Sequence, residues 1–105
     1  MATLRREDLD VLLRETIGYP KRKIYFQPPE STKITYPCLI YEFGGLSTKH
    51  ADDLPYFRAP YWEMTYITRD PDDEMIMKLS ELPQCAMGRS FVADNLYHYP
   101  YTIYY

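Results

Sequence analysis

The chain has 105 residues, the size of one ordinary domain, with 46% apolar residues, 26% charged residues and a formal net charge of −3. This composition is typical of a folded domain, and the mixed, slightly acidic charge excludes the basic surface of a nucleic-acid-binding protein. Cys38 and Cys85 belong to no CxxC pair and predict buried thiols rather than a disulfide, while no apolar run approaches the ~20 residues that span a bilayer. We therefore expect neither a membrane span nor export by the usual signal.

The first third of the chain predicts one helix and one strand. Residues 3–17 carry apolar side chains at helical spacing; Thr3 can cap this helix, and Gly18 and Pro20 end it. Residues 23–27 predict a short strand, which the prolines at 28–29 stop.

The middle of the chain predicts a long strand and a long loop. Residues 34–43 predict a central, largely buried strand, although Pro37 limits its first half to an edge or a bulge. Gly44-Gly45 reads as the end of that strand. Residues 44–60 have no consistent period and predict a loop, which at this length is often functional.

A strand and a helix follow this predicted loop. Residues 61–68 alternate as a strand, with Trp62, Met64 and Tyr66 on one face. Residues 71–82 predict a helix with Asp70 as its N-cap and Pro71 at its first position.

The end of the chain predicts one weak strand, at residues 90–93, and one tyrosine-rich strand, at residues 96–105. The turn between them falls at residues 94–95. The tyrosines of the last strand recur at every second position, which gives the strand one aromatic face, and Pro100 places it near a sheet edge or at a bulge. Together the elements predict an α+β domain: a mainly antiparallel sheet of roughly four to five strands with two helices packed on one face.

The sequence predicts no catalytic residues, no metal site and no cofactor. The acidic run at residues 70–74 suits a helix N-terminus, and neither His50 nor His98 lies in a ligand spacing. A Cys–His nucleophile pair is left open by the sequence, but Cys38 lies in an apolar strand where a thiol is usually inert. The residues 21–23, Lys-Arg-Lys, read as a charged turn, and no glycine-rich phosphate motif is present.

Aromatic side chains beyond those needed for the core predict a protein–protein interface, because Tyr, Trp and Met are enriched at such surfaces. We expect it to involve the loop and the C-terminal strand. The candidate interface residues are Leu54, Tyr56, Phe57, Arg58, Tyr101, Tyr104 and Tyr105.

Four strings of the sequence resemble a family of small structural proteins of tailed bacteriophages and prophages, described as tail terminator, tail-completion or head–tail joining proteins. They are IYFQPPES, YPCLIYE, TRDPDDEMIMKLSELP and FVADNLYHYPYTIYY, which lie between residues 24 and 105. The motifs are structural rather than catalytic.

The resemblance implies a non-enzymatic protein of the virion tail or neck, assembled in the host cytoplasm. It implies a homo-oligomeric ring, a hexamer in this family, that caps the tail tube and joins it to the head connector. DNA passes through its lumen without specific binding. Alternatives are a head-completion or connector-ring protein of the neck, and, from another class, a small prophage-encoded enzyme or a host-binding regulatory domain.

Overall fold

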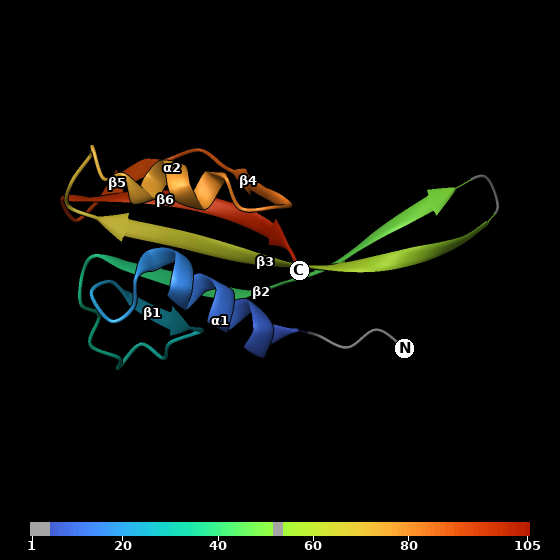
Figure 1. The fold of residues 1–105 in the computed structure, drawn as a ribbon, viewed down its shortest axis with the longest axis horizontal. Helices are drawn as coiled ribbons and strands as arrows, with labels where there is room; N and C mark the ends of the chain where they lie inside the picture. Colours follow the sequence, from blue (N-terminus) through green and yellow to red (C-terminus); the bar gives the residue numbers. More distant parts are fainter. Residues whose placement is uncertain (1–4, 52–53) are drawn as a thin grey trace.

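A computed structural model describes the backbone of residues 5–51 and 54–105, and the side chains of residues 5–46 and 59–105. The fold is α+β, with two helices and a six-stranded sheet (Figure 1). The elements in chain order are α1 (Arg6–Ile17), β1 (Lys23–Phe26), β2 (Cys38–Ala51), β3 (Leu54–Thr68), α2 (Met75–Ser80), β4 (Cys85–Met87), β5 (Phe91–Ala93) and β6 (Leu96–Tyr104). The strand order is β1-β2-β3-β6-β4, and β5 also pairs with β6.

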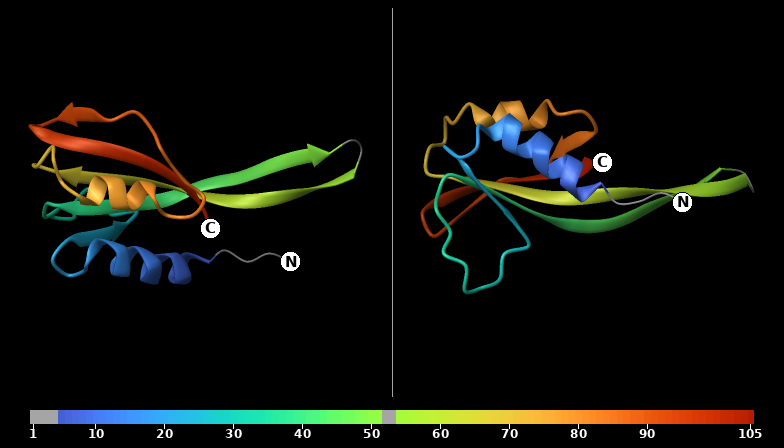
Figure 2. Two further views of the ribbon diagram at one scale, coloured as in Figure 1. Left: turned by 45° about the horizontal axis from the view of Figure 1, so that its top comes forward. Right: turned by 60° about the horizontal axis from the view of Figure 1, so that its bottom comes forward.

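Both helices lie on the same face of the sheet, as the sequence predicted (Figure 2). The main core contains apolar residues of α1 and α2 packed on large side chains of the central strands. The alternation predicted for β3 is confirmed, because Trp62, Met64 and Tyr66 are buried in this core while Glu63 is exposed. Tyr101 and Ile103 of β6 are buried beside them, so the period-two aromatic face of the last strand is also confirmed.

The sheet is mixed rather than wholly antiparallel. β1 pairs with β2 in parallel, whereas every other strand pair is antiparallel. A parallel pair needs a crossover connection, and residues 27–37 supply it with prolines at 28–29 and 37. This segment carries Ile34 and Tyr36 to the face opposite the helices, where they pack on a second small cluster of Cys38, Ile67 and Leu96. The predicted strand 34–43 therefore begins only at Cys38.

The predicted loop at residues 44–60 is wrong. β2 continues to Ala51 and β3 begins at Leu54, so these residues form a long antiparallel hairpin (Figure 1). We call the part of this hairpin that lies beyond the rest of the sheet, residues 46–51 and 54–60, the arm. The arm gives the molecule its elongated dimensions of 49 × 25 × 24 Å.

The glycine pair that read as the end of a strand is instead a β-bulge inside one. The register shifts between Phe43 and Gly45, which leaves Gly44 without a partner on β3. The ring of Tyr61 lies across both glycines, and a Cβ at Gly44 would come within 2.4 Å of that ring. Gly45 has φ of +144°. The two glycines therefore let β2 bend without leaving the ladder.

β6 lies one strand in from the sheet edge, so it is near the edge as predicted but has neighbours on both sides. β3 pairs with one side of it, and β4 and β5 pair with the other; β4 was missed in the sequence. Pro100 fits because its missing N–H falls between the segments paired with β4 and β5, where its carbonyl accepts the Gly88 N–H at 2.8 Å.

Both helices are shorter than predicted. The described part of α1 begins at Arg6, and Thr3 lies outside the described residues. Gly18 ends α1 with φ of +74°, as expected for a glycine C-cap. α2 begins at Met75 rather than at residue 71, because Asp70 accepts the N–H of Asp72 in a tight turn before the helix. No helix in the described part of the chain has the length and apolar character needed to cross a membrane.

Candidate functional site

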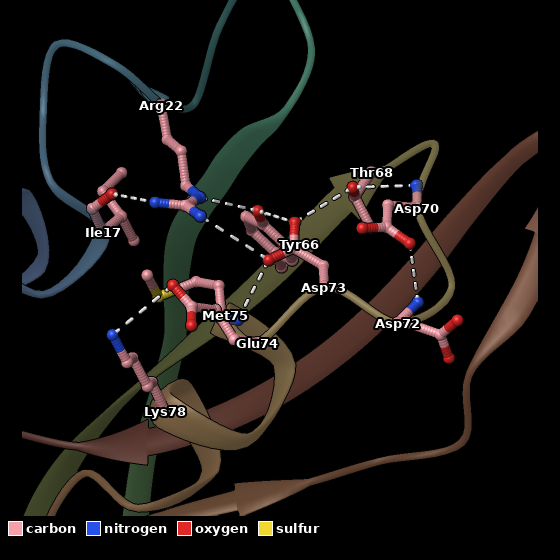
Figure 3. Close-up of polar contacts among 10 residues, drawn as sticks. All are labelled: Ile17, Arg22, Tyr66, Thr68, Asp70, Asp72, Asp73, Glu74, Met75 and Lys78. Atoms are coloured by element: carbon pink, nitrogen blue, oxygen red, sulfur yellow. Dashed lines mark hydrogen bonds and ion pairs between the residues drawn. The ribbon is translucent and has the colours of Figure 1, made fainter.

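Ionisable and hydroxyl side chains meet in one buried network at the end of β3 (Figure 3). Asp73 lies at its centre. Its Oδ2 accepts from the hydroxyls of Tyr66 at 2.6 Å and Thr68 at 3.1 Å, and its Oδ1 accepts the Met75 N–H at 2.9 Å. Glu74 is the N-cap residue of α2 and makes no capping bond with its side chain; Asp73, one residue earlier, instead accepts the N–H of the first helical residue, which is the role that the sequence assigned to Asp70.

Arg22 completes this network from the other side. Its Nε donates to the Tyr66 hydroxyl at 3.1 Å, and its Nη1 donates to the Ile17 carbonyl at 3.1 Å. Its Nη2 lies 3.7 Å from Asp73 Oδ1, with the two side chains 15% and 10% exposed. The network thus ties the end of α1, the end of β3 and the start of α2 together.

The protonation states in this network are fixed over the neutral range. Burial alone would raise the pKa of Asp73, but hydrogen bonds from Tyr66, Met75 and Thr68 and the charge of Arg22 outweigh it, so that the pKa is lowered. Burial and the bond to Asp73 raise the pKa of Tyr66. A permanent carboxylate beside a permanently protonated phenol suits a structural clamp better than proton transfer.

A smaller network fastens α1 to the sheet. The Tyr41 hydroxyl donates to Asp10 Oδ1 at 2.7 Å, and Arg14 Nε donates to Asp10 Oδ2 at 2.5 Å. Burial, with the bond to Asp10, raises the pKa of Tyr41 to about 12. These groups also satisfy one another, and no buried side-chain nitrogen or oxygen among the described residues is without a hydrogen-bond partner.

Cys38 and His98 are too far apart to form the Cys–His nucleophile pair that the sequence left open. Cys38 and Cys85 are free, and burial raises their pKa to about 12 and about 11 respectively. Ile67 lies between Cys38 and His98 in the register, which separates them by two strand spacings of about 5 Å each. His98 stacks on Phe91 at 4.7 Å, and the side chain of His50 lies outside the described residues. Across the described residues, no three His, Cys, Asp or Glu side chains cluster as metal ligands would.

The predicted interface residues fall into three groups. The side chains of Leu54, Tyr56, Phe57 and Arg58 lie outside the described residues, although their backbone forms the β3 strand of the arm. Tyr101 is in the core, 2% exposed, and its hydroxyl donates to an α2 carbonyl at 2.7 Å. Its side chain therefore does not reach the surface of this chain.

The two terminal tyrosines lie at the base of the arm. Tyr104 is 41% exposed, with its ring 5.8 Å from the ring of Tyr61. Tyr105 is half-buried; its N–H donates to the Pro60 carbonyl at 3.3 Å, and its ring lies 4.5 Å below the Arg5 guanidinium. Of the two, Tyr104 has the exposed ring that an interface could use.

The arm extends past the strands that flank the hairpin in the body of the protein. β1 pairs with β2 only as far as Tyr41, and β6 pairs with β3 only as far as Tyr61. Beyond these points each strand of the hairpin has one bonded edge, and no other strand from residues 5–51 or 54–105 lies beside its second edge. A two-stranded ribbon of this kind is marginally stable in water, so a surface that pairs with it would stabilise it.

No protein-family model matches this sequence, and no curated protein matches it either. The resemblance to phage tail proteins therefore stays a prediction.

Sequence reasoning missed the buried network because its members looked ordinary one at a time. Arg22 was read as part of a charged turn, and Asp73 as one of several acids suited to a helix dipole. A signal was present, however: Tyr66 was predicted on the same strand face as Trp62 and Met64, and if that face is buried the tyrosine hydroxyl needs a polar partner.

Proposed function

We propose that this protein is a non-enzymatic assembly protein of a bacteriophage tail, forming a ring that caps the tail tube and joins it to the head or neck. The observation that carries the proposal is the arm, a hairpin that leaves the body and whose two outer edges pair with no further strand in the described part of the chain. The four sequence strings that resemble tail terminator proteins supply the biological setting.

The arm supports an assembly role because an isolated two-stranded hairpin is only marginally stable in water. Among the residues that the structure describes, no third strand pairs with the arm and no helix covers it (Figure 1). A hairpin with free edges is, by contrast, well suited to reach a neighbouring subunit or the tube. The polar networks, whose groups are satisfied internally, support a structural rather than a chemical role.

The partners in this proposal are further copies of the chain, the tail tube protein and the neck proteins, and the site of action is the virion. A hexamer is the ring size that the resemblance implies. DNA passes through the lumen without specific binding. Glu42 and Glu63 give some support to an acidic lumen wall, because they lie directly opposite each other, exposed, on the face away from the helices. Like charges in this position repel each other, and they would also repel phosphate.

Light scattering after size exclusion, over a concentration series, tests the proposal. We expect a closed ring, either in solution or after purified tail tubes are added. A chain that stays monomeric at every concentration and binds no tubes would contradict it. Binding to portal-containing heads instead of tubes would favour the alternative, a connector ring of the neck, which the arm fits equally well.

A further inference from the structure

The body of the protein has an open strand edge at β4 and β5. Both strands are antiparallel to β6 and lie end to end along its outer side (Figure 1). Asp94 and Asn95 both have positive φ and make a two-residue hairpin turn, which makes the adjacent pair Ala93 and Leu96 a hydrogen-bonded pair. Paired positions alternate along an antiparallel ladder, so the N–H and C=O of Val92 point away from β6.

The same alternation places the N–H and C=O of Met87 on the outer side of β4. The Gly88 N–H donates to Pro100, and Ala86 lies opposite Thr102. The main-chain groups that point toward β6 are therefore those of Ala86 and Gly88, the residues on either side of Met87. Within the described residues, no strand lies beyond β4 or β5 to pair with these outward groups.

Exposed apolar side chains gather on this edge. Met87 is 44% exposed, Phe91 52% and Val92 63%. The register puts Met87 and Val92 on the helix face of the sheet and Phe91 on the opposite face, so exposed apolar side chains flank the unpaired main-chain groups on both faces. An edge of this kind favours the addition of a further strand.

The arm offers one usable edge. On its β3 side, the position at the base is Pro60, which has no N–H to give and whose carbonyl already accepts from Tyr105. The main-chain carbonyl of Pro60 therefore points away from β2. The main-chain N–H and C=O of Leu46, its partner in the register, correspondingly point away from β3. Two residues further along β2, the main-chain N–H and C=O of Thr48 also point away from β3. No proline occurs in β2 from Cys38 to Ala51, so this edge can both donate and accept.

We propose that the β2 edge of the arm pairs with the β4–β5 edge of a second copy of this chain. This inference rests on the proposed ring function and names the contact that would build the ring. The arm cannot reach its own β4–β5 edge, because β6 and β3 lie between and the arm extends away from them (Figures 1 and 2). One chain thus carries both halves of a strand-addition contact. The two halves differ, so the contact is head-to-tail, which is the kind that closes into rings.

Substitution on each half of the contact tests the proposal. Val92→Lys places an ammonium group on the acceptor edge, and lysine at such positions blocks edge pairing. Val11→Lys on α1 is the matched control, since Val11 is also an exposed valine, at 55%. Thr48→Pro removes one outward donor from the arm and leaves the inward ladder of β2 intact. Met87→Lys is a second variant on the acceptor edge. Circular dichroism melting checks that each variant remains folded.

We expect the acceptor and arm variants each to weaken assembly by about tenfold or more, while Val11→Lys assembles as the unsubstituted chain does. Mixing Val92→Lys with Thr48→Pro in equal amounts should give dimers and nothing larger. In that mixture one intact arm can meet one intact edge, but the ring cannot close. Native mass spectrometry with a mass tag on one variant identifies the dimer.

Failure of this inference can be told from failure of the proposed function. If the unsubstituted chain assembles and Val92→Lys assembles equally well, the β4–β5 edge is not the acceptor, and the ring function stands without this contact. Normal assembly of Thr48→Pro would likewise overturn the role of the β2 edge. If the unsubstituted chain neither assembles nor binds tail tubes, both proposals fail together.

Discussion

Replacing Asp73 by asparagine should destabilise the fold strongly, because it breaks the network that joins α1, β3 and α2. The substitution keeps the shape of the side chain and removes its charge. Arg22, only 15% exposed, would then lie buried opposite a neutral amide. The Tyr66 and Thr68 hydroxyls would lose the carboxylate oxygen to which both donate. Removing one partner of a buried ion pair costs about 3 kcal/mol, which would lower the melting temperature by roughly 10–20 °C.

The effect of this substitution should also depend on pH, in a direction that the pKa of Asp73 fixes. That pKa is lowered from its ordinary value of 3.8. A lowered pKa means that the carboxylate contributes its full stabilisation above the unfolded-state value and loses it as the pH falls through the folded-state value. Asp73→Asn lacks this contribution at every pH. The difference in unfolding free energy between the two proteins should therefore shrink as the pH falls from neutrality to about 3.

Urea unfolding at several pH values measures both quantities, and Asp72→Asn is the matched control. Asp72 lies in the same turn, is exposed, and has no side-chain hydrogen bond or ion pair in the described structure. We expect its substitution to change stability by less than about 0.5 kcal/mol. A loss below about 1 kcal/mol for Asp73→Asn, or a difference that stays constant with pH, would refute the view that charge holds this network.

Three further predictions follow from contacts elsewhere in the fold. Gly44→Ala should cost about 1–3 kcal/mol, because its Cβ would come within 2.4 Å of the Tyr61 ring, and adding Tyr61→Ala should recover part of that loss in a double-mutant cycle by thermal melting. Cys38 is buried and Cys85 partly buried, with pKa values raised to about 12 and about 11, so both should react slowly with a thiol reagent at mildly alkaline pH and rapidly in denaturant; rapid labelling of Cys38 in the native protein would contradict its burial. Tyr101→Phe should cost about 1 kcal/mol in urea unfolding, since it removes one hydroxyl bond to α2, and an unchanged stability would show that this bond contributes nothing.

The parts of the fold that the sequence predicted are those with one buried face. The alternation in β3 and β6 was readable because Trp62, Met64 and Tyr101 must point at the helices while their neighbours point away. Gly18 was readable because its left-handed conformation is rare for other residues. In each case one local requirement, burial of a face or a left-handed backbone conformation, restricts which residue types can occupy the position.

The arm was missed for the opposite reason. A ribbon of two strands standing clear of the body has no face that must be apolar, so residues 46–60 show no period of two. The sequence GGLSTKHADDLPYFRAP then reads as a loop, and Gly44-Gly45 reads as a turn rather than as a bulge. The direction of β1 was equally hidden, because four residues at a sheet edge have the same pattern whether the pair is parallel or antiparallel.

The capping residue of α2 shows a third kind of limit. Asp70, Asp72 and Asp73 are all reasonable caps by local rules. What selects Asp73 is the arrangement of Tyr66 and Arg22, which come from other parts of the chain and meet its carboxylate in three dimensions. Local sequence can thus predict that a helix begins here, but the tertiary contacts decide at which residue.

The same location in the sheet marks the end of the core and the start of the arm. Phe43 and Trp62 pack edge to face at 5.2 Å on the helix face of the sheet, just before this point. Immediately beyond them β2 bulges at Gly44, and β1 and β6 no longer flank the hairpin. The core residues that the structure describes therefore lie on the body side of this point, and Leu46, just beyond it, is 47% exposed. A two-stranded ribbon is marginally stable in water, so pairing with another molecule would stabilise the arm; in the proposed contact, a second copy presents its β4–β5 edge, flanked by Met87, Phe91 and Val92.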